Sequence, residues 1–246
     1  MPDVLSRKLE NFTRLSPEDR RALDAATAER VRQFAAREDI AREGDKQDRL
    51  SVILSGWACR YKQLEDGRRQ ILAFLLPGDM CDLDATLLAE MDHSMGALST
   101  VSTAELTQEV VAALRERPRV EKALVWETLV NAATQREWTV SIGQRNALER
   151  LSHLFCELFL RLRAVGLTDG DSCAFPITQV ELGYATGLSN VHVNRTLQEL
   201  RAAGLVVLKD RVLTLPRLPA LMRAGLFNPN YLHLDREGRD FDAPTG

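Results

Sequence analysis

The stretch that decides the fold of this chain is FPITQVELGYATGLSNVHVNRTLQELRAAGLVVLKDRVLTL, residues 175–215. Thr178 can cap a short helix, and the glycine within residues 186–188 permits a tight turn after it. Ser189 can cap a second helix, which Gly204 ends. Two short helices joined by a turn that contains glycine are typical of a helix-turn-helix, so the stretch predicts one.

A β hairpin is expected directly after the second helix. Residues 206–208 and 212–215 are apolar and predict two short strands. They flank the turn Lys209-Asp210-Arg211, whose two basic side chains suit a contact with a phosphate backbone. The whole stretch therefore predicts a winged helix-turn-helix. A helical hairpin with an ordinary polar surface is the alternative that these residues alone leave open.

The polar side chains left exposed on the second helix suit a groove of double-stranded DNA. Arginine can donate two hydrogen bonds to guanine, and asparagine can pair with adenine. The backbone N–H groups at a helix N-terminus attract phosphate. We therefore predict binding of double-stranded DNA through Thr178, Ser189, Asn190, Val191, His192, Asn194, Arg195, Lys209 and Arg211.

Residues 35–110 have the pattern of a β domain. Apolar and polar residues alternate after Trp57, and Asp66-Gly67 is a strong signal for a hairpin turn. Short strands punctuated by glycine predict a small antiparallel barrel or roll, although a generic β domain also fits. The expected strands are 50–54, 57–62, 71–76, 95–101 and 105–110.

Three further helices are predicted. Ser16 and Pro17 begin the first, which runs to about residue 28. The stretch from Pro118 to Gly143 holds no other glycine or proline and predicts one long helix. The third covers roughly residues 146–164.

Apolar residues recur every three or four positions along the long helix, which gives it an apolar stripe. A helix of this length suits packing against a second copy of the chain, and we predict a dimer interface there. The alternative is that the helix covers its own β domain. The residues of the predicted interface are Ala123, Trp126, Val130, Ala133 and Val140.

The composition is that of an ordinary globular protein. The chain has 246 residues, of which 45% are hydrophobic and 27% charged, and its net charge is -3. No apolar run approaches the roughly 20 residues that span a bilayer, and the N-terminus lacks a signal core, so a cytoplasmic protein is expected. Residues 136–223 carry 11 Lys and Arg against 8 Asp and Glu, which makes this segment the one expected to meet a polyanion.

No pattern typical of a metal centre or an enzyme is visible. The four cysteines include no Cys-x-x-Cys pair, and their scattered spacing suits a reducing compartment. The four histidines form no motif, and no nucleophile–base pair or phosphate-binding loop is present. We predict no enzyme activity and no cofactor. His153 is expected to be structural, and Tyr231 and His233 to dock the C-terminal segment.

The chain resembles the Crp/Fnr family of bacterial transcription regulators over residues 12–230. The segments that carry the resemblance are REGD at 42–45, LEDGRRQILAFLLPGD at 64–79 and SNVHVNRTLQELRAAGL at 189–205. The resemblance implies an α+β fold: a cyclic-nucleotide-binding-like antiparallel β roll, a long dimerisation helix and a C-terminal winged helix-turn-helix. The expected divisions are a sensor domain at 1–117, the dimerisation helix at 118–146, the DNA-binding domain at 147–222, and a docking segment with a tail at 223–246.

The resemblance also implies a function. A homodimer would bind a palindromic operator, with RNA polymerase as a further possible partner. The family commonly has a glutamate where this chain has Val191. Valine cannot accept a hydrogen bond from cytosine, although it can contact a thymine methyl group, so a different operator is expected.

The sequence departs from the family in the effector pocket. The family's cyclic-nucleotide pocket uses a Gly-Glu pair and an Arg-Ser pair, where this chain has Asp82-Leu83 and His93-Ser94. Aspartate repels a phosphate and leucine cannot bind a ribose hydroxyl, so no tight binding of cyclic AMP is predicted.

The N-terminal cysteine cluster of iron–sulfur sensors is also absent. The alternative left open is a small-molecule, haem or redox-responsive signalling module whose DNA binding requires an effector. In that case His93 would be the candidate haem ligand, and Cys81 or Cys59 the candidate redox thiol.

Overall fold

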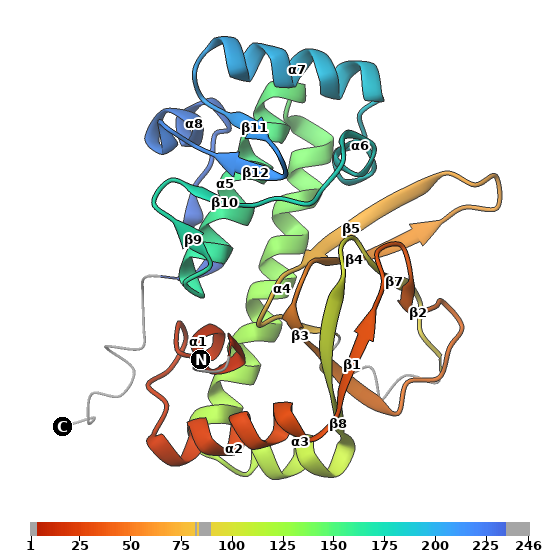
Figure 1. Cartoon of the computed structure of the whole chain (residues 1–246), viewed down its shortest axis with the longest axis vertical. Coiled ribbons are helices and arrows are strands. Elements are labelled where there is room, and N and C mark those ends of the chain that lie inside the picture. The colour runs from red at the N-terminus through yellow and green to blue at the C-terminus, as the bar shows by residue number, and fades with distance from the viewer. Residues whose placement is uncertain (1–3, 82, 84–89, 235–246) are drawn as a thin grey trace.

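The computed structural model describes residues 4–81, 83 and 90–234, and it confirms the predicted α+β architecture (Figure 1). The winged helix-turn-helix and the N-terminal helices lie at opposite ends of the molecule, with the β roll beside the long helix α4. The helices are α1 (Val4–Leu9), α2 (Pro17–Glu29), α3 (Gln108–Arg115), α4 (Pro118–Gln144), α5 (Ala147–Ala164), α6 (Gln179–Thr186), α7 (Asn190–Ala202), α8 (Leu218–Ala224) and the 3-10 helix η2 (Pro229–Leu232). The strands are β1 (Val31–Phe34), β2 (Asp39–Ala41), β3 (Arg49–Ser55), β4 (Ala58–Gln63), β5 (Arg69–Leu75), β6 (Met80–Cys81), β7 (Ser94–Ala97), β8 (Val101–Thr107), β9 (Thr168–Asp169), β10 (Ser172–Ala174), β11 (Val207–Lys209) and β12 (Val212–Thr214).

Two antiparallel sheets form the β roll. Their strand orders are β1-β8-β3-β6 and β2-β7-β4-β5. The predicted turn at Asp66-Gly67 joins β4 to β5, and the register of this hairpin pairs Tyr61 with Ile71. The interior of the roll is filled by apolar side chains of both sheets, among them Phe34, Ile53, Leu75 and Val101.

The last predicted strand needs a correction. Strand β8 ends at Thr107, and residues 108–115 form helix α3 instead. The side chain of Thr107 accepts a hydrogen bond from the backbone N–H of Val110 and thereby caps the helix. Val110 and Val111 pack on a buried apolar cluster that includes Leu9, Leu23 and Leu106 and is called the N-terminal core below. The prediction was wrong there because a short apolar run fits a strand and a buried helix equally well.

The three other predicted helices are confirmed, and their caps explain where they begin. Ser16 and Asp19 form a reciprocal capping box at the start of α2, with Pro17 in the first turn. Asn146 and Glu149 form the same arrangement at the start of α5. Helix α4 has 27 residues and begins at Pro118.

The apolar stripe predicted for α4 faces two ways. Ala123 and Val130 are buried in the N-terminal core of the same chain, and Trp126 stacks on Phe12 with ring centroids 6.3 Å apart. Ala133 is half-buried, and Val140 is exposed. Ala123 and Val130 are therefore not accessible to a second chain in this structure. The large apolar side chains that α4 leaves exposed are Val125, Leu129, Val140 and Ile142.

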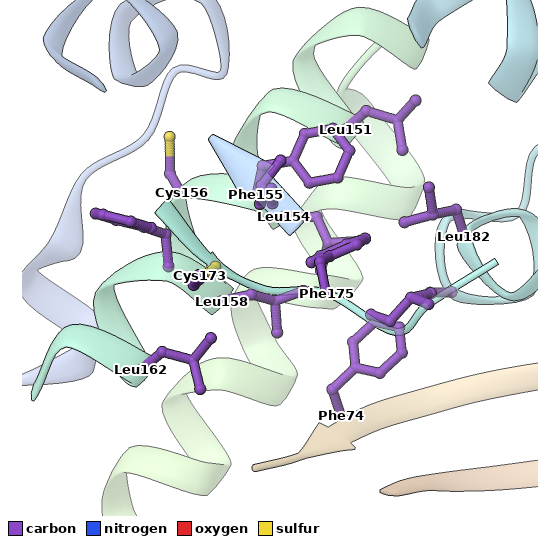
Figure 2. Packing of buried hydrophobic residues seen from close by; sticks show 14 of the residues in the cluster. Phe74, Leu151, Leu154, Phe155, Cys156, Leu158, Leu162, Cys173, Phe175 and Leu182 are labelled. Atoms are coloured by element: carbon purple, nitrogen blue, oxygen red, sulfur yellow. The ribbon is translucent and has the colours of Figure 1, made fainter. Parts of the chain in front are cut away.

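An aromatic cluster joins the β roll to the part of the chain that holds the helix-turn-helix (Figure 2). Phe175 packs on Trp57 and on Phe155, with ring centroids 5.5 and 5.6 Å apart. Phe74 of β5 packs on Trp138 of α4 at 5.8 Å. Figure 2 shows Phe74 and Phe175 next to the leucines of α5. The part of the chain that holds the β roll and the part that holds the helix-turn-helix, called the two lobes below, consequently share one hydrophobic core.

The C-terminal segment folds back onto α4 and α5. The Tyr231 hydroxyl donates a hydrogen bond to Glu157 at 2.8 Å, and its ring stacks on His153. The ring of His233 contacts Trp126, with centroids 5.0 Å apart. His153 itself is buried. These contacts agree with the structural role expected for His153 and with the docking role of the two C-terminal residues.

Candidate nucleic-acid interface

The turn between α6 and α7 has the geometry of a helix-turn-helix. Gly187 ends α6 with φ of 68°, in the left-handed region that favours glycine. Gly183 lies so close to the following turn that a Cβ there would be 2.7 Å from the carbonyl oxygen of Leu188. The guanidinium of Arg150 donates to the carbonyl oxygen of Thr186 at 2.8 Å and fixes the turn on α5. The predicted boundaries of both helices are thus confirmed.

Helix α7 has one buried face and one exposed face. Val193, Thr196, Leu197 and Leu200 are buried against the domain core. The opposite face carries every residue predicted to contact bases or phosphates from this helix. Those exposed residues are Asn190, Val191, His192, Asn194 and Arg195, and Gln198 lies on the same face.

The N-termini of the two helices differ in their charge. At α6, the hydroxyl and backbone N–H of Thr178 both donate to the carboxylate of Glu181. A phosphate would have to displace this carboxylate, so Thr178 is a weaker candidate for a phosphate contact than its position suggests. At α7, Ser189 accepts from the backbone N–H of His192 at 3.3 Å, and the first turn holds no acidic residue. The N-terminus of α7 is therefore open to an anion.

The side chains of the exposed face of α7 are only loosely held. Asn194 donates to the side chain of Gln179 at 3.2 Å, which links it to α6. The Arg195 guanidinium lies 3.9 Å from the Glu199 carboxylate, and both side chains are exposed. A surface pair of this kind contributes about 0–1 kcal/mol, so Arg195 can leave it for a base. Gln179 was not among the predicted site residues, although its position as the first residue of α6 places it at the crossing with α7.

The predicted wing is present, and its two basic residues are both exposed but have different neighbours. Asp210 and Arg211 both have positive φ, 51° and 60°, which closes a tight turn between β11 and β12. Lys209 is exposed on β11. Arg211 instead lines a cleft toward the β roll, beside Trp57 and Phe175. Lys209 is therefore the better placed of the two for a DNA backbone.

The predicted effector positions that the structure describes form no phosphate site. Asp82 lies outside the described residues. Leu83 is half-buried against the N-terminal core. The Nδ1 atom of His93 lies 2.6 Å from the carboxylate of Asp92, and Ser94 accepts a hydrogen bond from the backbone N–H of Glu43 at 3.0 Å. A carboxylate beside His93 is unfavourable for a bound phosphate.

Three of the four thiols are poorly suited to redox sensing. The side chains of Cys59, Cys81, Cys156 and Cys173 are all buried, and none of them forms a disulfide. Burial raises the pKa of the Cys59 thiol to about 11, and of Cys156 and Cys173 to about 12. Because the thiolate is the reactive form, these three thiols are held in their unreactive state.

Metal ligation and membrane insertion find no support in residues 4–81, 83 and 90–234. In these residues, no three His, Cys, Asp or Glu side chains gather as ligands would. None of the helices in the same ranges combines the length and the apolar character that crossing a bilayer requires.

Two protein families match this chain. Residues 31–117 match the cyclic nucleotide-binding domain, and residues 149–224 match the Crp-like helix-turn-helix domain. These ranges contain the β roll and the winged helix-turn-helix respectively.

Similar proteins align with this chain over most of their length. The transcriptional activator protein FnrL of Cereibacter sphaeroides is 25% identical over 76% of this chain and 78% of its own. The nitrogen fixation regulation protein FixK of Rhizobium meliloti is 26% identical over 70% of this chain and 75% of its own. The structure of FixK2 from Bradyrhizobium japonicum superposes with a TM-score of 0.69 at 23% identity, covering 79% of this chain and 96% of that one.

Proposed function

Because this chain is a transcription regulator of the Crp/Fnr family, we propose that it binds a palindromic DNA operator as a homodimer. Each protomer would place α7 in the major groove of one half-site. The observation that carries the proposal is the surface of α7. Its N-terminus is free of acidic residues, and Asn190, Asn194 and Arg195 are exposed along one side.

The residues of this surface divide by chemistry into two groups. Backbone N–H groups after Ser189, together with His192 and Lys209, would contact phosphates and set the register. Base edges would be read by the exposed side chains of α7, because arginine and asparagine can each make paired hydrogen bonds in the major groove. The residues proposed to read bases are Asn190, Val191, Asn194 and Arg195.

The dimer interface that we propose lies on the outer face of α4. Val125, Leu129 and Val140 are 48%, 53% and 47% exposed, and Ala132 lies between them. From residue 125 to residue 140 the helix rises about 22 Å. A two-fold axis beside this stripe would bury the same apolar residues of both copies. Compared with the interface predicted from the sequence, this stripe leaves out the buried residues Ala123 and Val130 and retains Val140.

We propose further that the regulator binds its operator without cyclic AMP. The carboxylate of Asp92 beside His93 and the apolar side chain of Leu83 support this. We also propose that the protein acts in the cytoplasm and contacts RNA polymerase at the promoter. We propose no catalytic activity for it.

Selection from random duplex DNA tests the proposal directly. The purified, reduced, full-length protein would be used with no ligand added. We expect enrichment of a two-fold symmetric site whose half-sites are about 34 Å apart, bound by two chains. Enrichment of no site, with only salt-sensitive general binding, would contradict it.

A pair of variants then tests the assignment of α7. Arg195→Ala should cost about 1–3 kcal/mol of operator affinity and relax discrimination at one base pair. Arg14→Ala removes an exposed arginine distant in sequence from α7 and should leave both unchanged. If operator affinity survives Arg195→Ala, the assignment of α7 as the recognition helix is wrong.

A further inference from the structure

A cleft of about 640 Å³ lies between the β roll and the winged helix, away from the positions of the family's nucleotide pocket. One wall comes from α1 and from the turn between β3 and β4, including Leu54 and Trp57. The other wall comes from the DNA-binding lobe, including Leu162, Leu167 and Phe175. Its size falls within the range of about 300–1,000 Å³ that is usual for small-molecule sites, which often lie between domains.

Two arginines line this largely apolar cleft, one from each lobe. Arg7 belongs to α1, and its Nη1 atom lies 3.0 Å from the position that a Cβ on Gly166 would occupy. Arg211 belongs to the wing. Within the part of the chain that the structure describes, no carboxylate pairs with either guanidinium, and the buried Nε atom of Arg7 has no hydrogen-bond partner. Among the described residues, neither positive charge therefore has a counter-ion.

We propose that this cleft binds a small carboxylate with an apolar body. The apolar walls around Trp57 and Phe175 would take the body, which gains free energy by leaving water. The guanidinium of Arg7, assisted by Arg211, would take the carboxylate, because its planar fork of N–H donors matches two carboxylate oxygens. Since the two walls belong to the two lobes, the bound molecule would hold the lobes in their present arrangement.

Leu83, His93 and Ser94, the described residues among those predicted for the cyclic-nucleotide pocket, do not line this cleft. The site is therefore independent of Leu83, His93 and Ser94, and it does not depend on whether the protein binds DNA. A binding measurement on the protein alone can test it. Failure of that measurement would leave the proposed DNA binding unaffected.

The experiment is calorimetric titration of the full chain with decanoate, kept below the concentration at which it forms micelles, and in parallel with 2-naphthoate. We expect saturable binding of at least one of the two, with one molecule per chain. Arg7→Gln removes the proposed carboxylate partner and should weaken binding about tenfold or more. Leu167→Asp places a carboxylate at an exposed position of the cleft, 38% exposed, and should weaken binding to a similar degree.

Matched controls separate the proposed site from general hydrophobic binding. Arg14→Gln removes an exposed arginine that does not line the cleft and should leave the affinity unchanged. Decanol has an apolar chain of the same length without the charge and should bind at least about tenfold more weakly than decanoate. Thermal unfolding of each variant checks that it is folded. The proposal is overturned if neither carboxylate binds saturably, if both cleft variants bind like the wild type, or if decanol binds as tightly as decanoate.

Discussion

Val191 is the most exposed large apolar side chain in the part of the chain that the structure describes, at 77%. It stands in the first turn of α7, between polar neighbours that suit DNA. An apolar side chain held in water at this position gains from a partner such as the methyl group of thymine. The operator preference of this regulator should therefore depend on Val191 itself.

Replacing Val191 with glutamate should change which base is preferred. A carboxylate accepts a hydrogen bond from the amino group of cytosine, and it cannot hold a thymine methyl group. We expect Val191→Glu to lose about 1–3 kcal/mol on the selected site and to favour cytosine at one position per half-site. Repeated selection with the variant measures this.

Gln198→Glu is the control for the added negative charge. Gln198 is exposed on the same face of α7, about two turns further along. Its replacement should weaken binding to all sequences similarly and leave the preferred bases as they are. An unchanged base preference in Val191→Glu would show that residue 191 does not contact a base.

His153 makes the stability of the protein sensitive to pH. Burial lowers its pKa to about 4, and the nearby Arg145 guanidinium adds to this effect, although Glu137 lies 3.3 Å away. The unfolded chain takes up a proton at this residue near pH 6.5 and the folded chain near pH 4. Between these values the unfolded state holds more protons, so the free energy of unfolding falls as the pH falls.

The loss attributable to His153 should reach about 2–3 kcal/mol at pH 4. Urea unfolding at several pH values measures it, and His153→Gln should give a flatter decline between pH 6.5 and pH 4 than the wild type. His192→Gln, which removes an exposed histidine, should not change the decline. Parallel curves for wild type and His153→Gln would contradict the prediction.

At the scale of single elements, the sequence predicted best what local chemistry decides. The caps predicted at Ser16, Thr178 and Ser189 all form, because a cap depends on residues within one turn of it. The turn at Gly187 likewise needs only a left-handed residue. These signals were sufficient to locate the helix-turn-helix.

What the sequence could not predict depends on contacts between distant elements. Helix α4 has apolar residues on both sides, and only the folded chain shows that Ala123 and Val130 face the N-terminal core. Arg211 lines the cleft toward the β roll because its neighbour Phe175 docks on Trp57, more than 100 residues away in the chain. Periodicity gives the spacing of a stripe but not the surface that it meets.

The outer stripe of α4 should hold the dimer together. Leu129→Glu puts a charge from each copy near the two-fold axis, where like charges repel and lose water. We expect this variant to be monomeric at concentrations where the wild type is dimeric, as measured by sedimentation equilibrium, and to lose cooperative operator binding. Leu64→Glu is the matched control, because Leu64 is 52% exposed at the β4–β5 turn and Leu129 is 53% exposed. Equal dimerisation of the two variants would exclude this face.

At the scale of the whole molecule, a buried cluster of charges connects the lobes. Asp79, which follows β5, lies 2.8 Å from the Lys8 ammonium of α1 and 2.6 Å from the Arg161 guanidinium of α5. Glu127 of α4 lies 3.6 Å from Lys8, and Glu157 of α5 lies 3.3 Å from Arg161. The cluster thus joins the lobe of the β roll, the long helix α4 and the lobe of the helix-turn-helix.

The two kinds of buried acid in this cluster behave differently. Burial alone would raise the pKa of Asp79, but Lys8 and Arg161 outweigh it and hold the pKa at about 2. Burial raises the pKa of Glu127 and of Glu157. The contribution of Asp79 to stability is therefore complete above the ordinary pKa of an aspartate and is lost as the pH falls toward 2.

Removing the charge of Asp79 should weaken both the fold and the operator complex. Asp79→Asn leaves Lys8 and Arg161 buried without their shared partner, which typically costs about 3–5 kcal/mol. Because the cluster sets the position of α5, and α5 carries the helix-turn-helix, operator affinity should fall although Asp79 makes no contact with α7. Urea unfolding at pH 7 and operator binding by the folded fraction measure the two effects.

Glu105→Gln provides the matched comparison within one lobe. Glu105 is also a buried acid, but its partners Arg30 and Arg32 have side chains 54% and 52% exposed, so both can return to water. Its loss should cost about 1 kcal/mol or less and leave operator affinity unchanged. If Asp79→Asn destabilises the protein but binds the operator as tightly as Glu105→Gln does, the cluster stabilises the fold without positioning the recognition helices, and the shared aromatic core around Phe175 must position them instead.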